Sequence, residues 1–196
     1  WLQGQVKAHS GGAAAGLGMP ARPPTVVLAP PAKLKHGSKA ALVHGLCHAE
    51  SVAIDLMADL LARFWEEDMP PEFYDDWTRI AGEEAAHFRV WRRRLQDLGS
   101  DYGAFTAHDS LWQSAEDTQH DLLARLAIVH LVHEARGLDV APAGLAKFER
   151  SNPPDDASVA ILQKNVGEEV THVGAAVKWF RFLCNKRGEE ACAAFH

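Results

Sequence analysis

The phrase Gly-Glu-Glu-x-x-His occurs twice in this chain, as AGEEAAHF at residues 81–88 and as VGEEVTHV at residues 166–173. The shorter pattern Glu-x-x-His is expected by chance about 0.7 times at this composition, but the full pattern fewer than ~0.01 times. Residues three apart lie on one face of a helix, so each copy can direct a carboxylate and an imidazole at one point. The repeat therefore predicts two matching helices that present the same pair of ligands.

Two further acidic residues stand at matching distances before the two copies. Glu50 precedes Glu84 by 34 positions, and Glu134 precedes Glu169 by 35. Each half of the chain thus reads as a helix with one glutamate, a break, and a helix with Glu-x-x-His. Dinuclear metal sites in helical bundles use such a set. The predicted metal ligands are Glu50, Glu84, His87, Glu134, Glu169 and His172, with Glu84 or Glu134 as the bridging carboxylate, and no further catalytic residue is predicted.

The charge of this ligand set predicts the number of cations. Burying one unpaired carboxylate costs several kcal/mol, and four of them in one place repel one another. Two divalent cations would balance the four carboxylates. Oxygen and imidazole ligands suit iron or manganese, and zinc can also bind such a set. The sequence therefore predicts two metal ions, with iron expected first and manganese or zinc as alternatives.

Three other polar side chains lie close to the ligands in sequence. Glu83 and Glu168 each precede a ligand by one residue, and each can accept the free N–H of a metal-bound imidazole and so fix the ring. The alternative is a solvent-facing glutamate in a helical salt bridge. His130, four residues before Glu134, is a candidate to support or extend the site, although a satisfied histidine of the core, with its nitrogens hydrogen-bonded, is the favoured interpretation.

Apolar residues recur at three- and four-residue spacing, and the alternation typical of strands is absent. Helices are expected over residues 38–65, 72–98, part of 109–136 and 155–187, with shorter ones at 142–150 and 189–195, and residues 135–144 are expected to interrupt the third long helix. Ser38 is a suitable N-cap. The predicted class is all-α, a four-helix bundle with short additional helices over residues 38–196. Residues 1–37 are rich in Gly, Ala and Pro and are predicted to form an extended or mobile arm.

The composition argues against several classes of partner. The net charge of −6 disfavours nucleic acid or an anionic membrane surface as the main partner. No apolar run approaches the ~20 residues of a membrane-spanning helix. The three widely spaced cysteines form no disulfide framework and fit a reducing compartment such as the cytoplasm. A small-molecule substrate or O2, and a second copy of the chain in a homodimer, remain as candidate partners, and no electron donor is identified.

The ligand pattern Glu50, Glu84-x-x-His87, Glu134 and Glu169-x-x-His172 resembles that of ferritin-like di-iron carboxylate proteins. The wider sequence from Pro23 to Gly188 is similar to the ferritin-like family called domain of unknown function 455. The motifs that carry this similarity are GSKAALVHGLCHAESVAIDL, DWTRIAGEEAAHF, RLQDLGSDYGAF, DLLARLAIVHLVHEARGLDV and GEEVTHV. The resemblance implies a ferritin-like fold and metal binding, and it implies no substrate.

Three hypotheses for the function follow from the predicted site. The first is an O2-dependent oxidoreductase or hydroxylase, with a substrate pocket lined by apolar residues such as Ala53, Ile54, Leu131 and Val173. The alternative is a metal-binding or iron-handling protein without an organic substrate. The third is a structural module with a vestigial site, and the complete ligand set argues against it.

Overall fold

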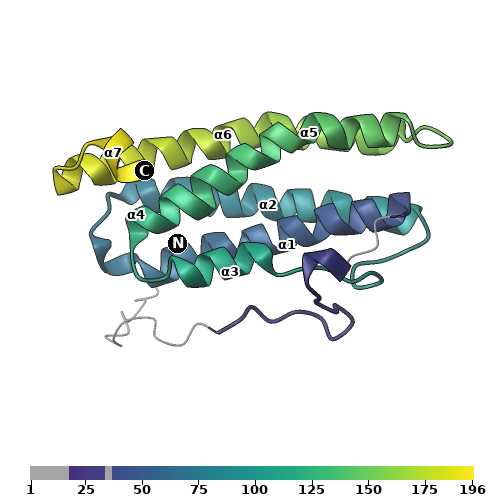
Figure 1. Cartoon of the computed structure of the whole chain (residues 1–196), viewed down its shortest axis with the longest axis horizontal. Helices are drawn as coiled ribbons and strands as arrows, with labels where there is room; N and C mark the ends of the chain where they lie inside the picture. Colours follow the sequence, from purple (N-terminus) through teal and green to yellow (C-terminus); the bar gives the residue numbers. More distant parts are fainter. Residues whose placement is uncertain (1–17, 34–36) are drawn as a thin grey trace, which may run out of the picture.

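The computed structural model describes residues 18–33 and 37–196, and residues 1–17 and 34–36 of the predicted arm lie outside this description. The described chain is helical and contains no strand, so the prediction of an all-α protein is confirmed (Figure 1). The helices are α1 (Lys39–Arg63), α2 (Pro71–Asp97), α3 (Ser110–Asp117), α4 (Leu122–Arg125), the π-helical segment η3 (Leu126–His133), α5 (Glu134–Glu149), α6 (Asp156–Arg187) and α7 (Ala191–Phe195), with short 3-10 turns η1 (Pro31–Lys33) and η2 (Trp65–Glu67).

Local chemistry sets the ends of the long helices. The hydroxyl of Ser38 accepts a hydrogen bond from the backbone N–H three residues later (3.1 Å) and caps α1, as predicted. Pro71 occupies the first position of α2, where its missing N–H needs no partner. Asp155 caps α6 through its side chain, and Gly188, with φ of 72°, ends this helix in the left-handed conformation.

The third long helix differs from the prediction. The chain breaks earlier, at residues 118–121, because the carboxylate of Asp121 accepts a backbone N–H three residues later (3.1 Å) and starts a new helix. From residue 122 the helix continues through η3 and α5 to residue 149. The predicted interruption at 135–144 was therefore wrong, and residues 142–150 do not form a separate helix.

A proline inside α5 explains why the sequence suggested a break there. Pro142 removes one backbone donor, which usually ends or bends a helix. Its side of α5 is exposed, so water can satisfy the carbonyl that loses its partner. The buried side chains of Ala141 and Phe148 anchor the helix on its other side, so packing outweighs the local preference.

The four long helical segments form two antiparallel pairs. α1 packs along α2, and α5 packs along α6 (Figure 1). The pairs meet where α6 contacts α2, whereas α1 and α5 have few direct contacts. The short helix α3 contacts both α1 and η3. The arrangement leaves α1 and α5 facing each other across a gap.

Residues 18–33, the described part of the predicted arm, contact the helices. The N–H of Ala29 donates to the carbonyl of Ala107 (2.8 Å), whose own N–H donates to Val27 (2.9 Å). Arg22 donates to the carboxylate of Asp55 on α1 (2.5 Å). This segment is thus fixed to α1 and to the loop before α3.

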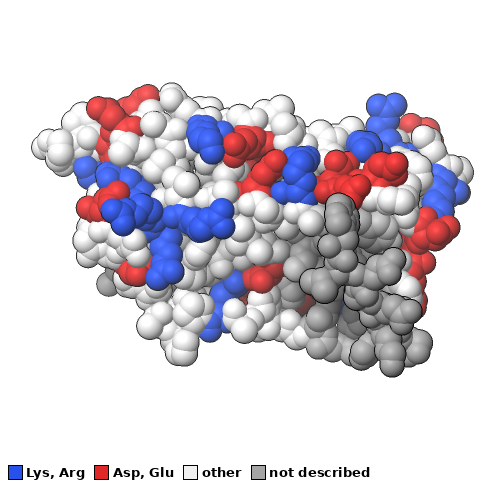
Figure 2. Space-filling model, turned by 180° about the vertical axis from the view of Figure 1, so that it is seen from behind, with Lys and Arg blue, Asp and Glu red and all other residues white. Residues whose placement is uncertain are grey.

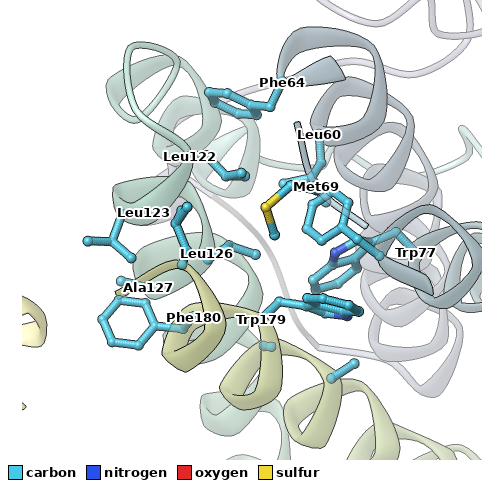
Figure 3. Close-up of a cluster of buried hydrophobic side chains, with 14 of the residues drawn as sticks. Leu60, Phe64, Met69, Trp77, Leu122, Leu123, Leu126, Ala127, Trp179 and Phe180 are labelled. Atoms are coloured by element: carbon cyan, nitrogen blue, oxygen red, sulfur yellow. The ribbon is translucent and has the colours of Figure 1, made fainter. Parts of the chain in front are cut away.

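Two apolar clusters occupy opposite ends of the helices. Figure 3 shows the larger one, in which Trp77 from α2 and Trp179 from α6 lie close to residues of α1 and α4. Its labelled members are Leu60, Phe64, Met69, Trp77, Leu122, Leu123, Leu126, Ala127, Trp179 and Phe180. The second cluster contains Trp91 from α2, Phe148 from α5 and Leu162 from α6. Both copies of the Gly-Glu-Glu-x-x-His phrase lie between the two clusters.

The surface carries charges of both signs. Seen from behind, acidic and basic side chains lie close to one another over much of the visible face (Figure 2). Several form ion pairs one helical turn apart, such as Arg79 with Glu83 (2.8 Å) and Lys164 with Glu168 (3.3 Å). Among the described residues no helix combines the length and apolar character needed to cross a bilayer.

A buried ion cluster links α1 to the break between α3 and α4. Arg125 is fully buried and donates to the carboxylate of Asp59, which also accepts from Arg63 (2.6 Å). The Arg125 Nε group donates to the hydroxyl of Thr118 (2.9 Å). Burial acts to raise the pKa of Asp59, but the hydrogen bonds from both arginines outweigh it and hold this pKa below its usual value.

Removing the carboxylate of this cluster is expected to destabilise the fold. Asp59→Ala leaves the buried Arg125 without its charge partner, so the free energy of unfolding should fall by about 3–5 kcal/mol. Urea denaturation followed by circular dichroism measures this loss. The control is Asp55→Ala, which removes the more exposed ion pair with Arg22 and should cost less than about 1 kcal/mol. Equal losses in the two variants would contradict the role of the cluster.

Candidate metal centre

Four helical segments bring the six predicted ligands to one place. Glu50 lies on α1, Glu84 and His87 on α2, and Glu169 and His172 on α6, while Glu134 is the first residue of α5, directly after η3. They form two groups, Glu50, Glu84, His87 and Glu169, and Glu84, Glu134, Glu169 and His172. Within each group the ligand atoms lie within 4.8 Å of one another, close enough to hold a metal ion.

Two carboxylates belong to both groups. The sequence predicted Glu84 or Glu134 as the bridging carboxylate, and the structure instead places Glu84 and Glu169 in both groups, with Glu134 in one. Glu84 and Glu169 are the glutamates of the two Glu-x-x-His patterns, so the shared pair follows the pseudo-two-fold relation of the repeat. Glu50 and Glu134 then occupy equivalent outer positions, one in each group.

The two imidazoles face the carboxylates with the same atom. Nδ1 of His172 lies 3.0 Å from Glu84 and 2.9 Å from Glu169. Nδ1 of His87 lies 3.5 Å from Glu84 and 3.3 Å from Glu169. The ring centroids are 6.0 Å apart. Each ring therefore offers one nitrogen to its group of carboxylates and turns the other nitrogen away.

The outward nitrogens are held by the additional glutamates of the repeat. Nε2 of His87 bonds to Glu168 (2.6 Å), and Nε2 of His172 bonds to Glu83 (2.8 Å). Each glutamate thus supports the imidazole of the other helix. Both also join helical ion pairs, Glu83 with Arg79 and Glu168 with Lys164, so both arrangements considered from the sequence are present. Because the outward bond orients the ring, it fixes which nitrogen faces the carboxylates.

The burial of Glu84 shows that the site fits cations. Its side chain is 1% exposed, and neither carboxylate oxygen has a hydrogen-bond partner among the described residues. Although Nδ1 of His172 is close to it, the two groups are not aligned for a hydrogen bond. Burial acts to raise the pKa of Glu84, but the imidazoles of His172 (3.0 Å) and His87 (3.5 Å) lie within ion-pair distance and hold this pKa below its usual value. A divalent cation would supply positive charge and direct bonds to both oxygens in place of the imidazole protons.

The same crowding sets the protonation of the metal-free site. Burial, with the charge of Glu84, raises the pKa of Glu50 well above its usual value, and burial, with the charge of Glu169, does the same for Glu134. Burial acts to lower the pKa of each imidazole, but the surrounding carboxylates outweigh it and raise the pKa of His87 and of His172 to about 11. Protons therefore occupy the positions that cations would take.

His130 lies outside both groups. It is fully buried, and its ring packs against Trp77 with centroids 4.6 Å apart. Neither ring nitrogen has a hydrogen-bond partner among residues 18–33 and 37–196, and burial lowers its pKa. The expectation that it shares a face with Glu134 assumed an α-helix, whereas η3 is π-helical and its hydrogen bonds span five residues. The position is buried in the core, but the ring lacks the hydrogen bonds to described residues that the favoured interpretation, a satisfied core histidine, assumed.

A cavity of about 550 Å³ opens between α1, α5 and α6 and reaches the carboxylates. Four glutamates of the site line it, namely Glu50, Glu84, Glu134 and Glu169, whereas neither imidazole does. Of the residues predicted to line a pocket, Ala53 does so, and Ile54, Leu131 and Val173 do not. The sequence missed the wall formed by Gly137, Ala141, Gly144 and Phe148, because a break was predicted in that part of α5. Their three- and four-residue spacing was the available signal.

The bond from Glu83 to His172 makes a prediction for metal affinity. Glu83→Gln removes the charge that holds the imidazole and should weaken metal binding about 10–100-fold. Competition with a chelator measures this affinity for Zn²⁺ and for Fe²⁺. By the symmetry of the site, Glu168→Gln should behave alike, and Glu72→Gln in the first turn of α2 serves as the control. Unchanged affinity in both site variants would mean that these glutamates act only through Arg79 and Lys164.

The protonated imidazoles predict that metal binding depends on pH. A cation can bind only when the protons on His87 and His172 leave, because the pKa of each is raised to about 11 in the metal-free site. Raising the pH removes these competing protons, so affinity should increase between about pH 6 and pH 9. Calorimetry in buffers of different ionisation enthalpy should detect proton release at pH 7. Affinity that is constant over this range, without proton release, would contradict the prediction.

Comparison with curated proteins finds one relative. An "Uncharacterized protein" of Haemophilus influenzae is 38% identical to this chain over 161 residues, which are 80% of this chain and 55% of that protein. The chain thus spans just over half the length of this relative. No solved structure matches the chain. The family described as "Protein of unknown function (DUF455)" matches residues 1–196, in agreement with the resemblance in the sequence. The chain is therefore a member of the DUF455 family.

Proposed function

We propose that this protein is a ferritin-like four-helix bundle that binds two divalent metal ions. The metal we propose is iron, and the reaction is an O2-dependent oxidation of a small organic molecule. The observation that supports this most is the position of the cavity. It reaches the four carboxylates, whereas the imidazoles of His87 and His172 do not line it. A molecule in the cavity would therefore meet the open side of the metal centre.

The two groups of side chains indicate how the ions would be held. Glu50 and His87 would bind one ion, Glu134 and His172 the other, and Glu84 and Glu169 both. Bound iron would supply electrons for the reduction of O2. Four carboxylates balance the charge of two divalent cations, so the buried site would be neutral when filled.

The remaining tasks belong to the protein. Glu83 and Glu168 hold the imidazoles in place from the outer side of the helices. Apolar residues of α1, α5 and α6 line the cavity beside the carboxylates and leave room for a substrate, which would displace water from this side of the site. An iron-handling protein without an organic substrate would not need an apolar cavity beside its metal site. The apolar cavity is thus the feature that favours an oxidoreductase over an iron-handling protein.

The test uses the full chain loaded with two equivalents of Fe²⁺ without oxygen and then mixed with O2. A transient visible absorbance and loss of Fe²⁺ are expected within seconds, with dithionite restoring the reduced state. Glu84→Ala removes a ligand shared by both groups, so it should bind fewer than two ions and lose the absorbance. Glu72→Ala is the control, because this residue lies outside the site.

The alternatives predict different results in the same experiment. O2 consumption that continues with growing amounts of iron, together with assembly into large particles, would support iron handling without an organic substrate. A protein that binds zinc as isolated and gives no reaction with iron and O2 would overturn the oxidoreductase. Two ions still bound by Glu84→Ala would overturn the ligand assignment.

A further inference from the structure

The cavity extends from the carboxylates along α5 toward the end of this helix. On α5 its lining runs from Glu134 to Lys147 and Phe148, with apolar or small residues between them. Lys147 follows Glu134 by 13 positions, which is about 20 Å along a helix. The facing walls are also mostly apolar in this part, with Leu42 and Leu46 from α1, and Asn165 of α6 is their polar member. The space is therefore long, and it is largely apolar between its two ends.

Two glycines of α5 shape this space in different ways. A Cβ atom at Gly144 would lie 3.1 Å from Leu162, so this glycine lets α5 approach α6 closely. A Cβ atom at Gly137 would meet no atom within 4 Å, although the residue lines the cavity. Glycine within a helix is less stable than alanine. No contact with residues 18–33 or 37–196 explains Gly137, and the space beside it remains open.

The two ends of the cavity differ in charge. At one end Glu84 is 1% exposed and has no hydrogen-bond partner for its oxygens among the described residues. At the other end Lys147 is exposed, and the described residues provide no ion-pair partner for it. Lys164 and Lys178, by contrast, each pair with an acidic side chain. Because helical side chains lean toward the helix N-terminus, the ammonium group of Lys147 leans back along the cavity.

We propose that this cavity binds a long-chain aliphatic carboxylate, with its carboxylate group at Lys147 and its chain extending between α1 and α5 toward Glu50 and Glu134. The length from Lys147 to the metal centre fits a chain of about 12–16 carbons, from the helix rise and the length of a C–C bond. The apolar walls match the chain, and the unpaired ammonium group matches its charge. Oxidation of the bound carboxylate would depend on the proposed function, whereas its binding does not.

Binding can be measured on the full chain loaded with zinc, so that no oxidation occurs. Saturated carboxylates of 8–18 carbons compete with a fluorescent fatty acid. Affinity should rise about threefold to fourfold with each methylene group until the cavity is filled, and then level off. Dodecanol and dodecyltrimethylammonium should bind at least about tenfold more weakly than dodecanoate, because they lack the charge that Lys147 attracts.

Substitutions test each end of the proposal. Lys147→Glu should weaken dodecanoate binding about tenfold while affecting dodecanol little, and Arg136→Glu, on the same helix but outside the lining, is its control. Gly137→Ala should weaken binding modestly, and Gly137→Leu by more than about tenfold, because the larger side chain fills the cavity. Gly82→Leu, on the exposed side of α2 where a Cβ meets no atom, controls for the cost of leucine in a helix. Circular dichroism checks that each variant is folded.

The outcomes separate this proposal from the proposed function. Affinity that does not depend on chain length or on the charge of the ligand, and that Gly137→Leu leaves unchanged, would overturn the proposal that the cavity binds a long-chain carboxylate. Binding that requires metal and is unchanged in Lys147→Glu would place the carboxylate at the metal centre and would also overturn it. If the carboxylates bind as expected but iron and O2 give no reaction, the proposed function fails alone. If iron and O2 react and the carboxylates do not bind, this proposal fails alone.

Discussion

Repulsion among four carboxylates at the centre of the helices is the constraint on which the rest of the structure depends. Glu84 is almost completely buried and has no hydrogen-bond partner among the described residues. Such a group persists only if the surrounding fold supplies the free energy to hold it. The apolar clusters at both ends of the helices do so, since Trp77 and Trp91 lie seven residues on either side of Glu84 on α2. Protons or cations then neutralise the charge that the clusters enclose.

The structure gives a position to both glutamates and the histidine of each Gly-Glu-Glu-x-x-His copy. The second glutamate and the histidine face the centre, and the first glutamate holds the histidine of the other helix. Neither copy is sufficient alone, because each supplies the support that the other requires. This reciprocal arrangement also joins α2 to α6, the contact that unites the two antiparallel pairs. The repeat thus encodes a contact between helices as well as a ligand set.

The sequence was sufficient to predict the helical class and the residues that meet at the centre, because their spacing follows the helical repeat. It was insufficient where tertiary packing opposes local preference. Pro142 and the glycines of α5 indicated a break, but the buried side chain of Phe148 keeps the helix continuous. His130 was judged by α-helical spacing, which η3 does not follow. The cavity wall was missed for the same reason, since it is formed by the helix that the sequence appeared to interrupt.

The separation of α1 from α5 has a consequence for how this scaffold can diversify. Gly137 and Val140 line the cavity but belong to neither apolar cluster. Changes at these two positions would alter the shape of the space while the residues that hold the charged centre and the helix ends stay the same. Substitutions at these two positions would therefore change which molecules fit into the space, while the charged centre beside it keeps its composition.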